Sequence, residues 1–321
     1  MTVDPRADAR RVVGDAYEVR VLEPSPPAVR DEPFSDDPPA RGVVPPGRRV
    51  VAPVTDGDVT WDELCREQES LARWCAERWL GPWPPLSPVS DADAFARTRE
   101  SWHALAEHVV CAKRHRANGK IGLRWVRDGF GTPFFGADEQ VRIAGGTVSY
   151  VTDREERTEP ITTIGAAAAF LGIAPGVPGD LFEPNIDGDP NRFLPIDVAA
   201  AALLAAWFGF ATSALAQLRV DLAYGRPSLI QLWPEHFDLA TDIGDGGSGG
   251  RANYGASPGD ERHPEPYLYV GPWDASRIAD GSGFWNEPFG ASLPYAAVAG
   301  TPESRTRALA FFTEGARRLA D

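Results

Sequence analysis

The segment that most constrains this fold is the uncharged stretch from Val198 to Leu218. It is long enough for a transmembrane helix, which needs about 20 apolar residues. Nearly half of it is alanine, however, while Gly209, Thr212 and Gln217 dilute it further and polar, turn-rich sequence follows. These features weaken membrane insertion. We therefore predict a buried core helix of a soluble protein, with a membrane span as the alternative.

The chain is 321 residues long and carries a formal net charge of −14. With 43% hydrophobic and 24% charged residues, it can bury a substantial core as one large domain or two modest ones. The negative charge disfavours a protein that grips nucleic acid or an anionic membrane, because both require a positive field. We therefore expect neither of those partners, and the small-molecule ligand that we expect follows from the segment 229–273 described below. The oligomeric state stays open.

The predicted location is the cytoplasm. Residues 1–10 contain no apolar region of the kind found in secretory signals. The three cysteines, Cys65, Cys75 and Cys111, are odd in number and form no CxxC pair. This usage indicates neither a disulfide framework nor a thiolate zinc site, and it is typical of a reducing compartment.

Two regions of the chain differ in composition. Residues 1–58 hold one predicted strand, at 17–22, and are then dense in proline, which favours an extended arm. Residues 59–321 form a predicted α+β body in which helices and antiparallel strands follow one another twice. The two rounds, 90–175 and 196–321, predict two similar halves, with gene duplication as one explanation.

Capping and turn signals set most element boundaries. Ser90 or Asp91 is a good N-cap for a helix that stops at Asn118-Gly119. Gly145-Gly146 is a two-residue turn that joins strands at 140–144 and 147–151. The other predicted elements are helices from Thr60 to before Gly81, at 163–171, from Val198 and after Thr301, and strands at 121–126, 229–239 and 267–270.

A short pattern of an aromatic residue, glycine, a small residue and proline recurs in the chain. Each copy predicts a buried ring beside a tight turn, and the recurrence is compatible with duplication. The copies are Phe130-Gly-Thr-Pro133, Tyr254-Gly-Ala-Ser-Pro258 and Phe289-Gly-Ala-Ser-Leu-Pro294.

The segment from Leu229 to Trp273 concentrates groups capable of chemistry. Its prolines keep the residues before them extended, and side chains alternate along extended backbone. This predicts that His236 and Asp238 share one face, and that Glu261, His263 and Glu265 share another. The candidate catalytic residues are His236, Asp238, Asp260 and Glu265, and the candidate ligand-binding residues are Trp233, Tyr254, Tyr267, Tyr269 and Trp285.

Three interpretations of this segment stay open. Imidazole and carboxylate groups suit a divalent metal, with His236, Asp238, Glu261 and Glu265 as candidate ligands. The same groups suit metal-free acid–base catalysis or ligand binding. A purely structural role is the third interpretation, because Asp, Glu and His near strand ends are usually solvated. None of the strong metal signatures, such as HExxH, occurs in the sequence.

Two other features are weaker candidates. His108, Cys111 and His115 fall close to one face of the predicted helix, a spacing compatible with a metal, and the nearby basic residues suit either an anionic ligand or a plain helix C-terminus. The glycine-rich run 244–250 lacks the lysine of a phosphate loop, and we interpret it as a flexible loop beside the site. Nucleophile-elbow and dinucleotide-binding motifs are absent from the sequence.

The motifs Trp-Pro-x-His-Phe-Asp at 233–238, Ser-Pro-Gly-Asp at 257–260 and Glu-Pro-Tyr-x-Tyr at 265–269 together resemble a family of bacterial proteins classified only as a domain of unknown function. The resemblance covers the C-terminal third and extends back to about residue 90. It implies that His236, Asp238, Asp260 and Glu265 belong to the family signature and that His263 does not. Residues 119–173 also resemble sterol-carrier-like domains in the order of their elements, which is a fold analogy.

The sequence thus predicts a soluble, acidic, cytoplasmic α+β protein with a small-molecule site around His236 and Asp238. A hydrolase-like or metal-dependent enzyme is one version of this hypothesis. The alternatives are a non-catalytic binding module for an apolar or amphipathic ligand and a structural scaffold. Whether the protein is an enzyme stays open.

Overall fold

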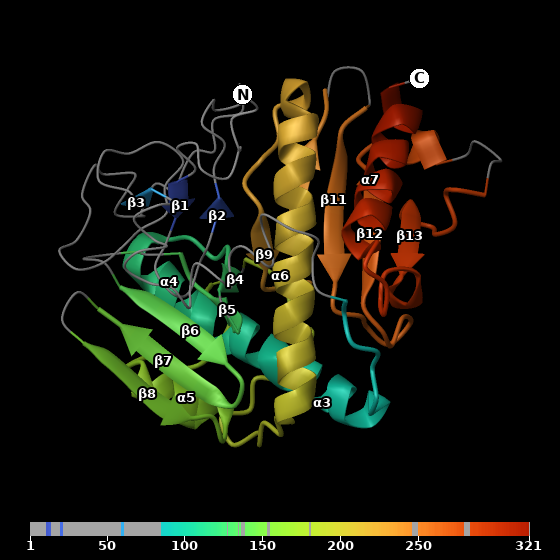
Figure 1. The fold of residues 1–321 in the computed structure, drawn as a ribbon. Coiled ribbons are helices and arrows are strands. Elements are labelled where there is room, and N and C mark those ends of the chain that lie inside the picture. Colours follow the sequence, from blue (N-terminus) through green and yellow to red (C-terminus); the bar gives the residue numbers. More distant parts are fainter. Residues whose placement is uncertain are drawn as a thin grey trace.

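The computed structural model describes residues 11–13, 20–21, 59–60 and 85–320, apart from 127, 134, 136–138, 153–154, 180, 246–249 and 279–282. It shows an α+β protein with two halves of similar layout, each combining helices with a five-stranded antiparallel sheet (Figure 1). A further small sheet pairs β1 (Arg11–Val13) with β2 (Arg20–Val21) and β3 (Val59–Thr60). Thr60, where a helix was predicted to begin, is the last residue of β3. The rest of that predicted helix and the proline-dense residues 23–53 lie outside the described residues.

The first half opens with a long helical segment whose ends match the predicted caps. Asp91 accepts a hydrogen bond from the Ala94 N–H at the start, and Gly119 ends the segment in the left-handed conformation, at φ 75°. The segment runs through α3 (Ala92–Leu105), the π-helix η3 (Ala106–Val110) and α4 (Cys111–Asn118), and the half continues with β4 (Arg124–Val126), β5 (Gly129–Gly131), β6 (Gln140–Ala144), β7 (Thr147–Val151), β8 (Glu156–Pro160) and α5 (Ile164–Phe170).

The second half follows the same plan. Its central helix is α6 (Val198–Asp221), and its strands form a meander in chain order, as those of the first half do. The remaining elements are η4 (Ala223–Gly225), β9 (Gln231–Trp233), β10 (Asp238–Ile243), β11 (Ala252–Ser257), β12 (Tyr267–Pro272), η5 (Ala275–Ile278), β13 (Ala291–Pro294), η6 (Tyr295–Ala297) and α7 (Ser304–Ala320).

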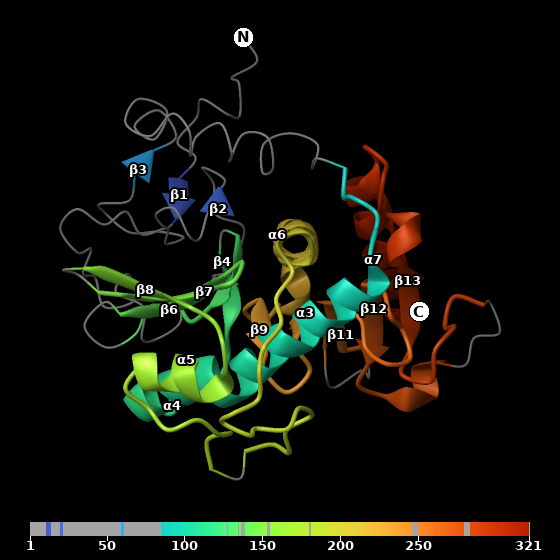
Figure 2. The same ribbon diagram turned by 90° about the horizontal axis from the view of Figure 1, so that it is seen from below.

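The two sheets meet at one edge each. Leu123, just before β4, exchanges two backbone hydrogen bonds of 2.8 Å with Leu232 of β9. Helix α6 runs between the sheets and contacts β4, β5, β10 and β11 (Figure 2). It is long and apolar enough to cross a membrane, yet 67% of its apolar window is buried inside the protein. The predicted core helix is therefore what the structure contains.

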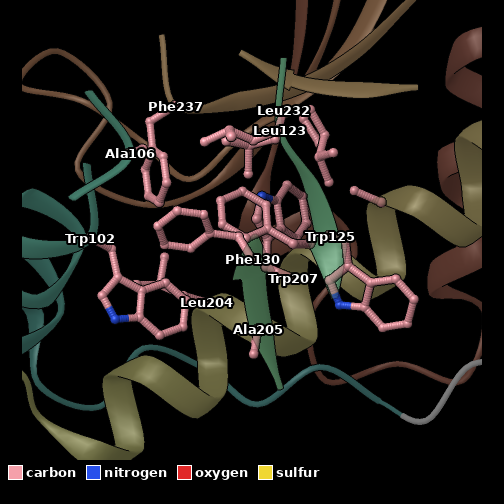
Figure 3. Close-up of a cluster of buried hydrophobic side chains, with 14 of the residues drawn as sticks. Trp102, Ala106, Leu123, Trp125, Phe130, Leu204, Ala205, Trp207, Leu232 and Phe237 are labelled. Atoms are coloured by element: carbon pink, nitrogen blue, oxygen red, sulfur yellow. The ribbon is translucent and has the colours of Figure 1, made fainter. Parts of the chain in front are cut away.

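Aromatic rings from both halves fill the space around α6. Phe237, directly before β10, lies 5.2 Å from the Phe130 ring of β5 and 5.4 Å from the Phe208 ring of α6, measured between ring centroids. Trp102 of α3 lies 5.6 Å from Phe130 (Figure 3). Because these rings come from four elements of both halves, the described body shares one hydrophobic core.

The recurring aromatic-glycine pattern marks strands rather than turns. Its copies overlap β5, β11 and β13. These strands occupy different positions in the two sheets, so the pattern gives no support to duplication. Strand β11 was not expected, because Ala252–Ser257 contains no β-branched residue, and its strand conformation comes from pairing with β10 and β12.

Candidate functional site

One face of the second sheet gathers most of the predicted site. Asp238 pairs with Trp233 of β9, and Tyr269 pairs with Gly255 of β11. Paired residues share a face, as do residues two apart on one strand, so Tyr267 joins the same face. The other face carries Leu239, Ala256 and Leu268 into the core. The face with Asp238 is called the outer face below.

Asp238 is a buried carboxylate on this outer face. Only 6% of the residue is exposed, its Oδ2 accepts a hydrogen bond from the Tyr269 hydroxyl, and its Oδ1 has no hydrogen-bond partner. Burial, reinforced by the charge of Glu235, raises the pKa of Asp238 against the opposing effects of Tyr269 and His236. A carboxyl group with a raised pKa and a free acceptor can exchange a proton with a ligand.

Tyr269 reaches Asp238 by lying across a neighbouring strand. A Cβ atom added at Gly255 would come within 2.5 Å of the Tyr269 hydroxyl and ring, so only glycine leaves room for the ring there. Burial and the Asp238 carboxylate together raise the pKa of Tyr269 well above its ordinary value. The hydroxyl therefore stays protonated and acts as the donor.

The turn before Asp238 corrects one expectation. Residues 234–237 form a turn between β9 and β10, so residues 229–239 are not one extended strand and His236 does not alternate with Asp238 along it. Phe237 closes this turn at φ 50°, a conformation that costs a bulky residue energy. His236 is exposed, yet its charge still acts on Asp238.

Asp260 organises the loop between β11 and β12. Its Oδ1 accepts the backbone N–H groups of Arg262 and His263, at 2.7 and 2.8 Å, and its Oδ2 accepts the Tyr267 hydroxyl at 3.1 Å. Partial burial favours the neutral acid, but these hydrogen bonds outweigh it and hold the pKa of Asp260 below its ordinary value. Asp260 is therefore an ionised structural group at the edge of the outer face.

Phe289 and the His263–Glu287 pair border the two tyrosines. His263 Nε2 lies 2.9 Å from Glu287 Oε1, and the imidazole ring lies 4.8 Å from the Tyr267 ring. Phe289 lies 6.4 Å from Tyr267 and 6.3 Å from Tyr269. Sequence reasoning missed Glu287 and Phe289, which lie outside the segment that carries the motifs.

Sequence reasoning also missed Glu107, a fully buried carboxylate in the π-helix η3. Its oxygens accept the backbone N–H groups of Asn185 and Ile186, at 2.8 and 3.0 Å, and lie 3.3 Å from His103 Nε2. Burial alone favours the neutral acid, but these contacts together hold the pKa of Glu107 below its ordinary value. The only hint in the sequence is an acidic residue within the otherwise apolar helix face.

The Glu107 network also supports the turn that carries His236. His103 Nε2 lies 3.0 Å from the Pro234 carbonyl oxygen, and its ring stacks on Phe237 at 5.3 Å. The Asn185 side-chain amide donates to the Glu235 carbonyl oxygen. These contacts link the π-helix to the turn that carries His236. π-Helical turns are frequent at functional sites.

Several predicted site residues lie elsewhere. Tyr254 is buried on the core face of β11, where it contacts Phe312 of α7 at 6.1 Å. Trp285 packs on Phe284, which in turn contacts α7. Glu265 and Glu261 are exposed, and the charge of Glu265 acts on the Tyr295 hydroxyl. Trp233, Tyr267 and Tyr269 remain on the outer face with Asp238.

The metal interpretation finds no support in the described part of the chain. No group of three or more His, Cys, Asp or Glu side chains there is arranged to hold a metal ion. The metal site considered on the helix, at His108, Cys111 and His115, is not supported either. His108 Nε2 contacts the Ile186 carbonyl oxygen at 2.7 Å, and the buried Cys111 thiol donates to the Glu107 carbonyl oxygen. His108 lies inside the π-helix, which changes the residue spacing of an ordinary helix face.

A cavity of about 410 Å³ lies away from this face, at the N-terminal ends of α3 and α6. Leu86, Phe95, Leu203 and Tyr295 are among its lining residues, and it shares none of them with the outer face. A buried polar atom without a partner, such as Asp238 Oδ1, indicates chemistry more directly than a cavity alone does. We therefore place the candidate site at Asp238.

Comparisons of the chain with known protein families, with curated proteins and with solved structures find no match. The resemblance to a bacterial domain of unknown function stays a prediction.

Proposed function

We propose that this protein binds a small molecule on the outer face of the second sheet, with Asp238 as the buried acid–base group that contacts it. One observation carries the proposal, namely that Asp238 is buried while its Oδ1 has no hydrogen-bond partner. A buried acceptor left without a partner costs about 1–3 kcal/mol. A ligand that donates to Oδ1 would recover part of this cost.

Two further observations favour a binding site over a purely structural role. Phe289 is 37% exposed on this face beside the half-buried Tyr267 and Tyr269, although phenylalanine side chains are usually buried. Phe237 holds a left-handed conformation directly before Asp238, and such conformations cluster at functional sites. Half-exposed rings beside a few convergent polar groups are typical of small-molecule sites.

The experiment is a fragment screen against the whole chain, followed by amide chemical shifts in NMR spectra. Fragments that bind should perturb the signals of Trp233, Asp238 and Tyr269 in the wild type and lose affinity in Asp238→Asn. Asp274→Asn is the matched control, because Asp274 is fully exposed and hydrogen-bonds within its own turn. Fragments that bind only at the Leu86–Phe95 cavity would contradict the proposal.

A further inference from the structure

Three aromatic rings of the outer face form a triangle. The ring centroids of Tyr267, Tyr269 and Phe289 are 6.3 Å, 6.3 Å and 6.4 Å apart. Phe289 is 37% exposed, and both tyrosines are half-buried. Strand register and the space above Gly255 hold the tyrosines in place. Three rings so close together form a small, partly open aromatic surface.

Three carboxylates, those of Asp238, Asp260 and Glu287, surround this triangle, and they are partly countered by His263 and by Arg99, whose charge acts on Asp260. The Tyr269 hydroxyl donates to Asp238, and the Tyr267 hydroxyl donates to Asp260 at 3.1 Å. A hydroxyl that donates to a carboxylate passes electron density into its ring, which strengthens the attraction of the ring face for a cation. Glu287 lies behind His263 at the same border, and the chain as a whole carries a net charge of −14.

No Lys or Arg side chain among the described residues stacks on the triangle, and His263, whose ring lies 4.8 Å from the Tyr267 ring, is held by Glu287. Where Lys or Arg side chains stack on rings in that part of the chain, the rings are those of Tyr150, Phe170, Trp273 and Phe284. In each of these pairs a cation of the protein already lies on the ring. Tyr267, Tyr269 and Phe289 therefore remain available to a cation from solution.

We propose that the ligand of the outer face is a small organic cation whose ammonium group lies against Tyr267, Tyr269 and Phe289 and is neutralised by the Asp238 carboxylate. This inference rests on the proposed function and adds the chemical class of the ligand. The faces of aromatic rings attract cations, and a hydrated metal ion benefits less from this attraction than an organic ammonium group does. An alkylated ammonium group also has an apolar surface that packs well against the rings. An anionic ligand would meet Asp238, Asp260 and Glu287 instead.

The test compares choline with the alcohol in which carbon replaces the ammonium nitrogen, a pair with the same shape and different charge. NMR titration of the full chain should show choline binding at least about 10-fold more tightly than the neutral alcohol. Phe289→Leu should weaken choline binding several-fold and leave the alcohol nearly unchanged. Phe284→Leu is the control, because Phe284 already stacks with Arg318 away from the triangle.

The outcomes separate this inference from the proposed function. Equal binding of choline and the alcohol at Asp238 would overturn the cation class and keep the small-molecule site. If neither compound binds but other fragments bind in a way that depends on Asp238, the cation class is likewise overturned and the small-molecule site is kept. If nothing binds at Asp238, neither the inference nor the proposed function stands.

Discussion

Replacing Tyr269 with phenylalanine tests whether Asp238 depends on one hydrogen bond. The variant removes the donor to Oδ2 and leaves both oxygens of a carboxyl that is 6% exposed without a partner. An unsatisfied buried acceptor costs about 1–3 kcal/mol, and a charged one lies toward the upper end. We therefore expect a loss of about 2–3 kcal/mol in the free energy of unfolding at neutral pH.

Tyr267→Phe is the matched comparison on the same strand. Asp260, its partner, is 47% exposed in its side chain and keeps the N–H groups of Arg262 and His263. The expected loss is about 0.5 kcal/mol, as for a solvated hydrogen bond. Urea unfolding of both variants measures the difference. Equal losses in the two variants would refute the reasoning that burial of Asp238 sets the cost.

The pH dependence of Tyr269→Phe has a defined sign. Burial raises the folded-state pKa of Asp238 above its unfolded value, so its contribution to stability is present at low pH and is lost as pH rises through the folded pKa. Removing the Tyr269 hydroxyl removes an effect that lowers this pKa. The stability deficit of the variant should therefore grow as pH rises above about 4.

Three further predictions concern the same network. Glu107→Gln should lower the free energy of unfolding by about 1–3 kcal/mol, because one N–H of Asn185 or Ile186 loses its acceptor. Since the folded-state pKa of Glu107 is lowered, this loss of stability should shrink as pH falls below about 4. The control is Glu100→Gln, on the exposed side of α3, which should change the denaturant midpoint little. Gly255→Ala should displace the Tyr269 ring and abolish fragment binding, whereas Gly146→Ala, with open space at Cβ, should not. Choline affinity should rise with pH through the pKa of Asp238, because the cation favours the carboxylate, and calorimetry in two buffers should detect proton release.

Local signals predicted the parts of the fold that depend on neighbouring residues. Asp91, one of the two predicted caps, begins α3, the helix predicted at 163–171 is α5, and α4 ends at Gly119 as the sequence predicted. The Gly145-Gly146 turn also sets the register of β6 and β7 as expected. Each of these features requires contacts only within a few residues, and such signals are visible in one sequence.

Distant contacts decided the rest. Glu107 meets a loop 78 residues away, and no pattern near Glu107 announces that pairing. Tyr267 and Tyr269 share one face of β12 because they are two residues apart, but Tyr254 belongs to a strand that only pairing creates. His236 left the expected strand because residues 234–237 turn instead. The site therefore shares Asp238, Trp233 and two tyrosines with the sequence-based hypothesis, while the candidate metal ligands do not converge in the described part of the chain.

The titration of the Asp238 side-chain carboxyl, followed by its carbon chemical shift in NMR spectra, tests the central claim most directly. If Asp238 is the buried acid–base group of a ligand site, its midpoint should lie clearly above the ordinary value of about 3.9, and added choline should lower it. A midpoint at or below about 3.9 that choline leaves unchanged would show a solvated or fully paired carboxylate and contradict the proposed site.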